Sequence, residues 1–228
     1  NLSSEFDQLM DRLAAEPAVM PANDPATGEP FVLTETDLAM GVHSALLQHD
    51  YFGWLPGGIH AAYEKDWGTF VQLAQSMNAG SGANEELAMK WVIQCSESWA
   101  RFDPAATKRN GAGSYLVDAE VAIAEQQGAV CAALPHGVVE ANDGEAVASD
   151  VPVLLLVGEA DPQNPPSNTA DASRDLPNSR RVVVPGEGHG VAQLGCLPGV
   201  VTAFIEAGTA DGLDVSCVQS MDPPRFQI

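Results

Sequence analysis

Residues 151–168 read VPVLLLVGEADPQNPPSN, a short apolar run that stops abruptly at an acidic turn. The length of the run and its valines favour a buried strand over 151–157. Asp161 then lies just past the end of this strand, at the edge where α/β sheets place their functional groups. A carboxylate at that edge suggests a partner, and the sequence offers one further along the chain.

The second run, RRVVVPGEGHGV at residues 180–191, ends in a histidine flanked by glycines. Its valines predict a strand over 180–184, so His189 follows the second strand as Asp161 follows the first. The flanking glycines give the backbone the freedom to project the ring. An acid and an imidazole on successive strand ends can touch, and the carboxylate then fixes the imidazole tautomer as a catalytic triad requires. A turn aspartate and a surface histidine are each common singly, but the paired placement favours the catalytic interpretation.

The sequence pattern changes near residue 150. Before residue 90 it predicts helices over 1–16, 35–49, 57–67 and 69–77, a Pro/Gly-rich connector at 16–30 and a flexible loop at 78–86. After residue 150, the two short strands alternate with helices expected near 166–176 and 192–207. This alternation is typical of an α/β fold with a parallel sheet.

Two strands cannot form a stable parallel sheet alone, because such sheets are covered on both faces and usually contain more strands. The middle of the chain offers MKWVIQCSE at 89–97 and GAVCAAL at 128–134, and neither is a convincing central strand. We therefore expect an incomplete sheet whose other strands lie outside this chain.

The composition restricts the class of protein. An apolar content of 45% in 228 residues supports a real core. Ten basic against 31 acidic residues give a formal charge of -21, which opposes nucleic acid and anionic membranes as partners and disfavours an anionic substrate. No apolar run approaches the roughly 20 residues of a membrane helix, so we expect a soluble protein. The start, NLSSEFDQLMDRL, reads as an amphipathic helix and not as a signal peptide, and it lacks an initiator Met.

Four cysteines, Cys95, Cys131, Cys196 and Cys217, allow three pairings. They form no CxxC or Cys/His cluster, so a metal site is a poor interpretation, and no cofactor is expected. Disulfides in a secreted protein, or in one of the periplasm or cell envelope, explain them better. Sequential pairing would close two moderate loops, each worth up to about 3 kcal/mol in the chain-entropy model. Four buried thiols in a cytoplasmic enzyme are the alternative.

Other reactive side chains fit a catalytic role less well. Cys95 lacks the flanking glycine of a cysteine-protease nucleophile. Ser81 and Ser114 both fail the G-x-S-x-G pattern, and neither follows a predicted strand. Glu159 competes with Asp161 as the acid, but it lies closer to the strand. Packing or solvated roles are expected for the other histidines, which are His43, His49, His60 and His136.

The last third of the sequence resembles the C-terminal part of α/β-hydrolases of the proline iminopeptidase and tripeptidyl-aminopeptidase kind. The resemblance rests on the two late cysteines and on the segments 149–168, 180–191, 204–208 and 223–226. In that family the triad order is Ser, Asp, His, and the acidic turn reads G-x-x-D-P followed by a Thr-Pro-like pair. Here GEADPQNP keeps the glycine, the aspartate and both prolines, with Asn164 where Thr is common. The GHG of the histidine motif matches closely.

The resemblance is less specific over the rest of the chain. Residues 1–90 look like the family's helical cap, and WVIQCSE at 91–97 is similar to the segment that returns from the cap to the core. The resemblance thus implies a cap over 1–90, followed over 91–228 by the return segment and the C-terminal part of the core. Within these parts we expect the sequential cysteine pairing.

One large departure separates this sequence from the family. The family's nucleophile elbow, G-x-S-x-G, and its oxyanion-hole glycines precede the cap, whereas this sequence begins at the cap. The resemblance therefore implies a hydrolase half, in which Asp161 orients His189 for a serine on a separate N-terminal fragment. We expect that fragment to pack against this chain.

The activity implied by the resemblance is that of a serine hydrolase, first of all an exopeptidase that releases residues from peptide N-termini. The acidic cap suits a substrate with a positive α-amine, and Glu97 is one candidate contact for it. A solvated helix-end carboxylate explains Glu97 equally well. An esterase-type α/β-hydrolase is the first alternative, because fold and triad do not choose the leaving group. A non-catalytic binding module derived from such an enzyme is the second.

Overall fold

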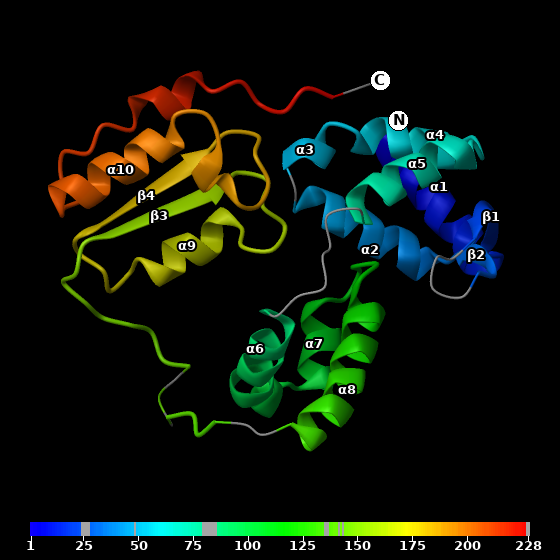
Figure 1. Ribbon diagram of the computed structural model, residues 1–228, viewed down its shortest axis with the longest axis horizontal. Coiled ribbons are helices and arrows are strands. Elements are labelled where there is room, and N and C mark those ends of the chain that lie inside the picture. Colours follow the sequence, from blue (N-terminus) through cyan, green and yellow to red (C-terminus); the bar gives the residue numbers. More distant parts are fainter. Residues whose placement is uncertain are drawn as a thin grey trace.

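The computed structural model describes residues 1–23, 28–47, 49–78, 86–134, 137–140, 142 and 144–226. Figure 1 shows three groups of elements that follow one another along the chain. They are an N-terminal group of helices with a small hairpin, a middle group of helices, and a C-terminal group in which two parallel strands run between two helices. The chain is thus of mixed α/β class. No described helix is long and apolar enough to cross a membrane.

The N-terminal group packs around one apolar core. Its elements are α1 (Leu2–Ala15), β1 (Ala18–Asn23), β2 (Pro30–Leu33), α2 (Glu35–Leu46), α3 (His49–Phe52), α4 (Leu55–Tyr63) and α5 (Trp67–Asn78). Leu9 and Leu13 of α1 are buried in the same cluster as Leu38 of α2, as their helical spacing predicts. Thr34 and Asp37 form a capping box that begins α2.

The segment 16–30, predicted to be a connector, contains the strand β1 and the first residue of β2 instead. β1 and β2 pair antiparallel, with Val19 opposite Val32. Met20 and Leu33 are buried while Val19 and Val32 are exposed, which is the alternation of a half-buried strand. The prolines of this segment argue against a strand, because proline cannot donate a backbone hydrogen bond to a neighbouring strand. Both strands of a two-stranded ribbon are edge strands, however, and edge strands tolerate proline.

The middle group is helical and is closed by a disulfide. Its helices are α6 (Glu86–Ile93), α7 (Pro104–Asn110) and α8 (Val117–Ala133), with a π-helical turn at Gln94–Ser98 and a 3-10 turn at Trp99–Arg101 between α6 and α7. Cys95 in the π-helical turn is bonded to Cys131 near the end of α8. The segments 89–97 and 128–134 are helical, in agreement with the prediction that neither is a central strand.

The C-terminal group alternates strands and helices, as predicted. Its elements are β3 (Val153–Gly158), α9 (Pro166–Ala172), β4 (Ser179–Val184) and α10 (Leu197–Ala207). β3 and β4 pair in parallel, from Val153 opposite Ser179 to Gly158 opposite Val184. Figure 1 shows α9 and α10 on either side of the two strands. Both strands therefore end at the same edge of the sheet. The predicted contact between Asp161 and a residue after β4 needs this arrangement.

Two helices of this group are shorter than predicted. α9 ends at Ala172, and the turn toward β4 follows it directly: the N–H of Arg174 donates to the carbonyl oxygen of Asp171 and that of Leu176 to the carbonyl oxygen of Ser173, both at 3.2 Å. The last helix begins at Leu197 and not at residue 192. Gly195, with a φ of 48°, interrupts the helical backbone before it.

The edge of β3 is open in the described part of the chain. There, β3 and β4 form a two-stranded sheet, so each has a strand partner on one side. Leu154, Leu155 and Leu156 of β3 are half-buried, although such a run is typical of a fully buried central strand. An unpaired edge on an apolar strand is a ready template for a further strand.

Candidate active site

Asp161 is held in the loop that follows β3. Its backbone N–H donates to the carbonyl oxygen of Gly158 at 3.3 Å, so the chain turns back at the end of the strand. Its Oδ1 accepts hydrogen bonds from the backbone N–H groups of Gln163 and Asn164, both at 2.9 Å. This is an Asx-type turn, in which an aspartate side chain mimics a backbone carbonyl. The turn fixes the orientation of the carboxylate, of which 4% is exposed.

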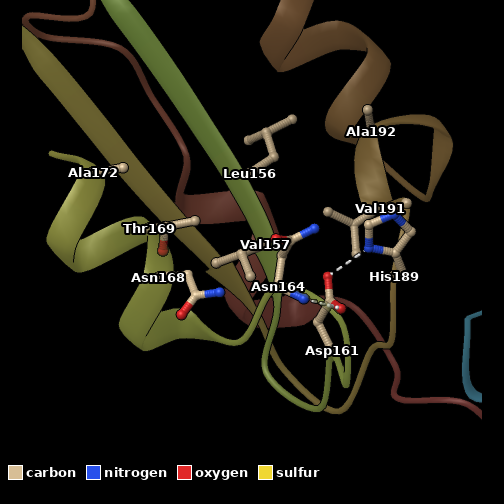
Figure 2. A pocket seen from close by; sticks show the side chains of 11 residues that line it. Leu156, Val157, Asp161, Asn164, Asn168, Thr169, Ala172, His189, Val191 and Ala192 are labelled. Atoms are coloured by element: carbon tan, nitrogen blue, oxygen red, sulfur yellow. Dashed lines mark hydrogen bonds and ion pairs between the residues drawn. The ribbon is translucent and has the colours of Figure 1, made fainter. Parts of the chain in front are cut away.

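His189 lies in the loop that follows β4 and faces this carboxylate. Its Nδ1 is 2.9 Å from Asp161 Oδ2, the oxygen that the backbone donors leave free (Figure 2). The loop turns at Gly186 and Gly190, whose φ angles of 67° and 78° are left-handed and suit glycine. The predicted contact between the two strand ends is present, while the catalytic role of the pair stays a prediction.

The environment of Asp161 favours its charged form. Burial raises the pKa of the Asp161 carboxyl. The hydrogen bonds from the backbone of Asn164, from His189 and from the backbone of Gln163 outweigh burial and hold the pKa below its usual value. The carboxylate is therefore ionised at neutral pH and can stabilise a positive charge on the imidazole.

The second ring nitrogen of His189 is available for chemistry. Among the described residues, the contact with Asp161 is the one hydrogen bond that the ring makes. A carboxylate on Nδ1 favours the tautomer that carries its proton there, which leaves a lone pair on Nε2. About a third of the side chain, 36%, is exposed, so a group from outside this chain can reach the ring.

Glu159, the competing acid, joins the two loops instead of facing the imidazole. Its Oε2 accepts a hydrogen bond from the backbone N–H of Gly186 at 2.9 Å. The backbone N–H of Ala160 donates to the carbonyl oxygen of Glu187, also at 2.9 Å. The loops after β3 and β4 are therefore bonded to each other at two points besides the side-chain pair.

A cavity of about 470 Å³ lies beside the pair. It is lined by Leu156, Val157, Asp161, Asn164, Asn168, Thr169, Ala172, His189, Gly190, Val191 and Ala192. Figure 2 shows the side chains of α9 on one side of the cavity, those of β3 at its centre, and His189 and Ala192 on the other side. None of these residues is a serine or cysteine, and the hydroxyl of Thr169 donates to the carbonyl oxygen of Pro166 at 2.9 Å. The described residues place an imidazole beside this cavity but no unengaged serine or cysteine in it.

The structure does not bring the other candidates to this cavity. Glu97 lies in the π-helical turn after α6 and is not among the lining residues. Cys95 is part of a disulfide, so it is not a nucleophile. Ser114 lies in the turn before α8, where its Oγ accepts a hydrogen bond from the N–H of Leu116 at 3.2 Å. Ser81 lies outside the described residues.

The cysteines are paired in sequential order, which is the expected pairing. Cys95 is bonded to Cys131, and Cys196 at the start of α10 is bonded to Cys217 in the last 3-10 turn. Two disulfides indicate that the protein forms in an oxidising environment. Within the described ranges, no group of three His, Cys, Asp or Glu residues is arranged to hold a metal ion.

Sequence reasoning missed a second histidine–carboxylate pair next to the site. His49 Nδ1 lies 2.7 Å from Glu187 Oε2, although a packed or solvated role was expected for His49. The two residues are 138 positions apart, so no local pattern could reveal their contact. The one sequence signal is Glu187 itself, a carboxylate that lies between two glycines and two positions before His189.

Residues 117–217 match the family model described as TAP-like protein. This is an α/β-hydrolase model (Abhydrolase_4), and the matched span contains both Asp161 and His189. The match and the mixed α/β structure support an α/β-hydrolase family, which is the broader part of the predicted resemblance. No curated protein and no solved structure matches the chain.

Proposed function

We propose that this chain supplies the acid and the base of a serine hydrolase. The observation that carries the proposal is the 2.9 Å contact between Asp161 Oδ2 and His189 Nδ1, with Nε2 left unbonded among the described residues. A buried carboxylate held by two backbone donors and turned toward an accessible imidazole is the arrangement that makes histidine a general base. The match to an α/β-hydrolase model over the same residues supports it.

In the proposed mechanism, Nε2 of His189 removes the proton of a serine hydroxyl while the serine oxygen attacks the scissile carbonyl. Asp161 stabilises the imidazolium that forms. The imidazolium then returns the proton to the leaving amine, and an acyl-enzyme is left. Water, deprotonated in turn by Nε2, attacks the acyl carbonyl, and the imidazolium returns this proton to the serine oxygen as the acyl group leaves. General acid–base catalysis of this kind contributes about 10²–10⁴-fold to the rate.

We further propose that the serine comes from a segment outside these residues, an N-terminal hydrolase fragment with the G-x-S-x-G pattern. Three features support this. The printed sequence contains no G-x-S-x-G. The lining of the cavity contains no serine among the described residues. The open edge of β3 offers a place where a further strand would pair.

For the substrate we propose a peptide with a free N-terminus. The formal charge of -21 favours a substrate with a positive amine over an anionic one. Glu97 stays a candidate for the amine contact, to be tested by substitution. The two disulfides support a location outside the cytoplasm, in the secreted fraction or the cell envelope.

The test is to co-express this chain with the segment encoded directly upstream and to purify the assembly. A fluorophosphonate probe should label a serine on the upstream segment, and labelling should be lost in His189→Ala but kept in Asp171→Asn, a change of an exposed carboxylate on α9. Aminoacyl and peptidyl anilides are then compared with short acyl esters as substrates. Hydrolysis of esters alone would favour the esterase alternative. If no upstream serine exists or is labelled, the chain is a binding module.

A further inference from the structure

The loop that carries His189 is held by the N-terminal group as well as by Asp161. The ring of His49, the first residue of α3, is bonded to Glu187, two positions before His189. The next residue, Gly188, lies against the backbone carbonyl of Leu46 at the end of α2, and a Cβ on it would overlap that oxygen. Figure 1 shows α3 beside the loop that follows β4. The corner between α2 and α3 thus contacts the two residues directly before the imidazole.

The buried carboxylate makes this contact specific. Glu187 is 2% exposed, and His49 is the one hydrogen-bond partner of its side chain among the described residues. A carboxylate that has left water is costly unless a donor satisfies it, so the loop strongly prefers the arrangement in which His49 donates. The ring of His49 is 41% exposed, so its replacement opens no large cavity. The pair is therefore a directed contact and not general packing.

A third segment, residues 223–226, also takes part in the contact between the corner of α2 and α3 and the loop that carries His189. We call this three-way contact the junction. The ring of Phe226 stacks on Phe52 of α3, with centroids 6.3 Å apart. Pro223 lies against Gly186, where an added Cβ would be 2.7 Å from the proline Cβ. The segment 223–226 therefore touches both α3 and the start of the His189 loop, and it holds them together.

We propose that Glu187, through His49, is a positioning residue that keeps Nδ1 of His189 within hydrogen-bonding distance of Asp161. The corner of the N-terminal group, part of the predicted cap, would thereby fix the place of the base. The inference rests on the proposed function only for the statement that His189 acts as a base. The positioning itself is a property of this chain and can be measured without catalysis.

Three variants separate positioning from folding. His49→Phe keeps a ring but removes the donor to Glu187. His49→Asn retains a donor near the place of Nδ1, so it should rescue. His60→Phe is the matched control, because His60 Nδ1 forms an equivalent bond of 2.9 Å to Glu5 Oε2 within the N-terminal group. Thermal unfolding of each variant establishes that it is folded.

The first readout is the Nδ1–H proton of His189 in NMR spectra of this chain labelled with ¹⁵N-histidine. We expect His49→Phe to accelerate its exchange with water at least about tenfold, while His49→Asn and His60→Phe leave it near the wild-type rate. The second readout is the kinetics of the assembly with the upstream segment. A displaced base should lower kcat by about 10–100-fold with KM little changed, since small misplacements in an active site have effects of this order.

Equal exchange rates and equal kcat in His49→Phe and His60→Phe would overturn the proposal. If His49→Phe does not fold, Glu187→Met, which keeps about the same volume and removes the acceptor of the His49 bond, decides it on the same two readouts. Failure of the proposed function looks different. In that case His189→Ala leaves hydrolysis unchanged or no serine is labelled, whereas the proton-exchange readout still reports whether His49 positions the loop.

Discussion

Replacement of Asp161 by Asn changes one non-hydrogen atom and should reverse the tautomer of His189. In the structure, Oδ1 accepts hydrogen bonds from the backbone N–H groups of Gln163 and Asn164, and Oδ2 faces the imidazole. An Asn side chain must keep its oxygen toward the two backbone donors, so its NH₂ group takes the place of Oδ2. That group donates to Nδ1, which therefore loses its proton to Nε2. A protonated Nε2 in a neutral ring cannot accept the serine proton.

The expected loss in kcat is about 10⁴-fold, the effect of the equivalent tautomer error in a serine protease triad. This corresponds to about 5.5 kcal/mol of transition-state stabilisation. Two measurements check the prediction. The ¹⁵N shifts of His189 should show protonated Nδ1 in the native chain and protonated Nε2 in Asp161→Asn, and the assembly with the upstream segment should lose hydrolysis accordingly. Asp171→Asn is the control for a carboxylate-to-amide change on a neighbouring element. An unchanged tautomer, or more than about a tenth of the native kcat, would refute the reasoning.

Three further changes test other parts of the structure. Since the pKa of Asp161 is lowered in the folded protein, its contribution to stability is present above the unfolded carboxyl pKa of about 3.9 and is lost as the pH falls through the folded pKa. The difference in Tm between the native protein and Asp161→Asn should thus shrink on acidification, and a difference that grows would contradict the lowered pKa. Replacement of Cys196 and Cys217 by Ser, which opens a loop with a sequence separation of 21, should lower the free energy of unfolding by about 3 kcal/mol in urea denaturation, against a small effect if the pair is not formed. Gly158→Ala should destabilise the folded protein by about 1–3 kcal/mol, because its Cβ would overlap the carbonyl oxygens of Glu187 and Gly188. A Cβ at Gly199 in α10 meets nothing within 4 Å, so the control Gly199→Ala should be neutral or stabilising. Equal Tm shifts for the two variants would argue against this packing.

The contact between Asp161 and His189 could be predicted because it follows from a rule about strand ends. Apolar runs located β3 and β4, and a parallel pair brings the residues after both strands to one edge. Asp161 and His189 occupy those places, so the prediction needed no knowledge of contacts. The β-hairpin at the N-terminal end was missed for the opposite reason. The prolines around Met20 argue against a strand more strongly than the alternation of side chains, of which Met20 is part, argues for one.

The surroundings of His189 could not be predicted from the sequence. Glu187 appears in the sequence as one more acid among 31, and its burial depends on where the corner of α2 and α3 lies. No periodicity relates His49 to a loop 138 positions away. Likewise, the late start of α10 depends on a single residue, Gly195, that acts on a helix end, where sequence patterns are least specific.

The junction beside His189 also has a consequence for the order in which the protein folds. It joins Leu46, His49 and Phe52 to the segments 186–189 and 223–226, which are far apart along the chain. Contacts between distant segments form late, because the entropy of loop closure must be overcome before they stabilise anything. The helices and the β3–β4 pair can therefore assemble while the imidazole is still unrestrained. A newly made chain would acquire an ordered His189 only in its last folding steps, after these three parts of the chain have met.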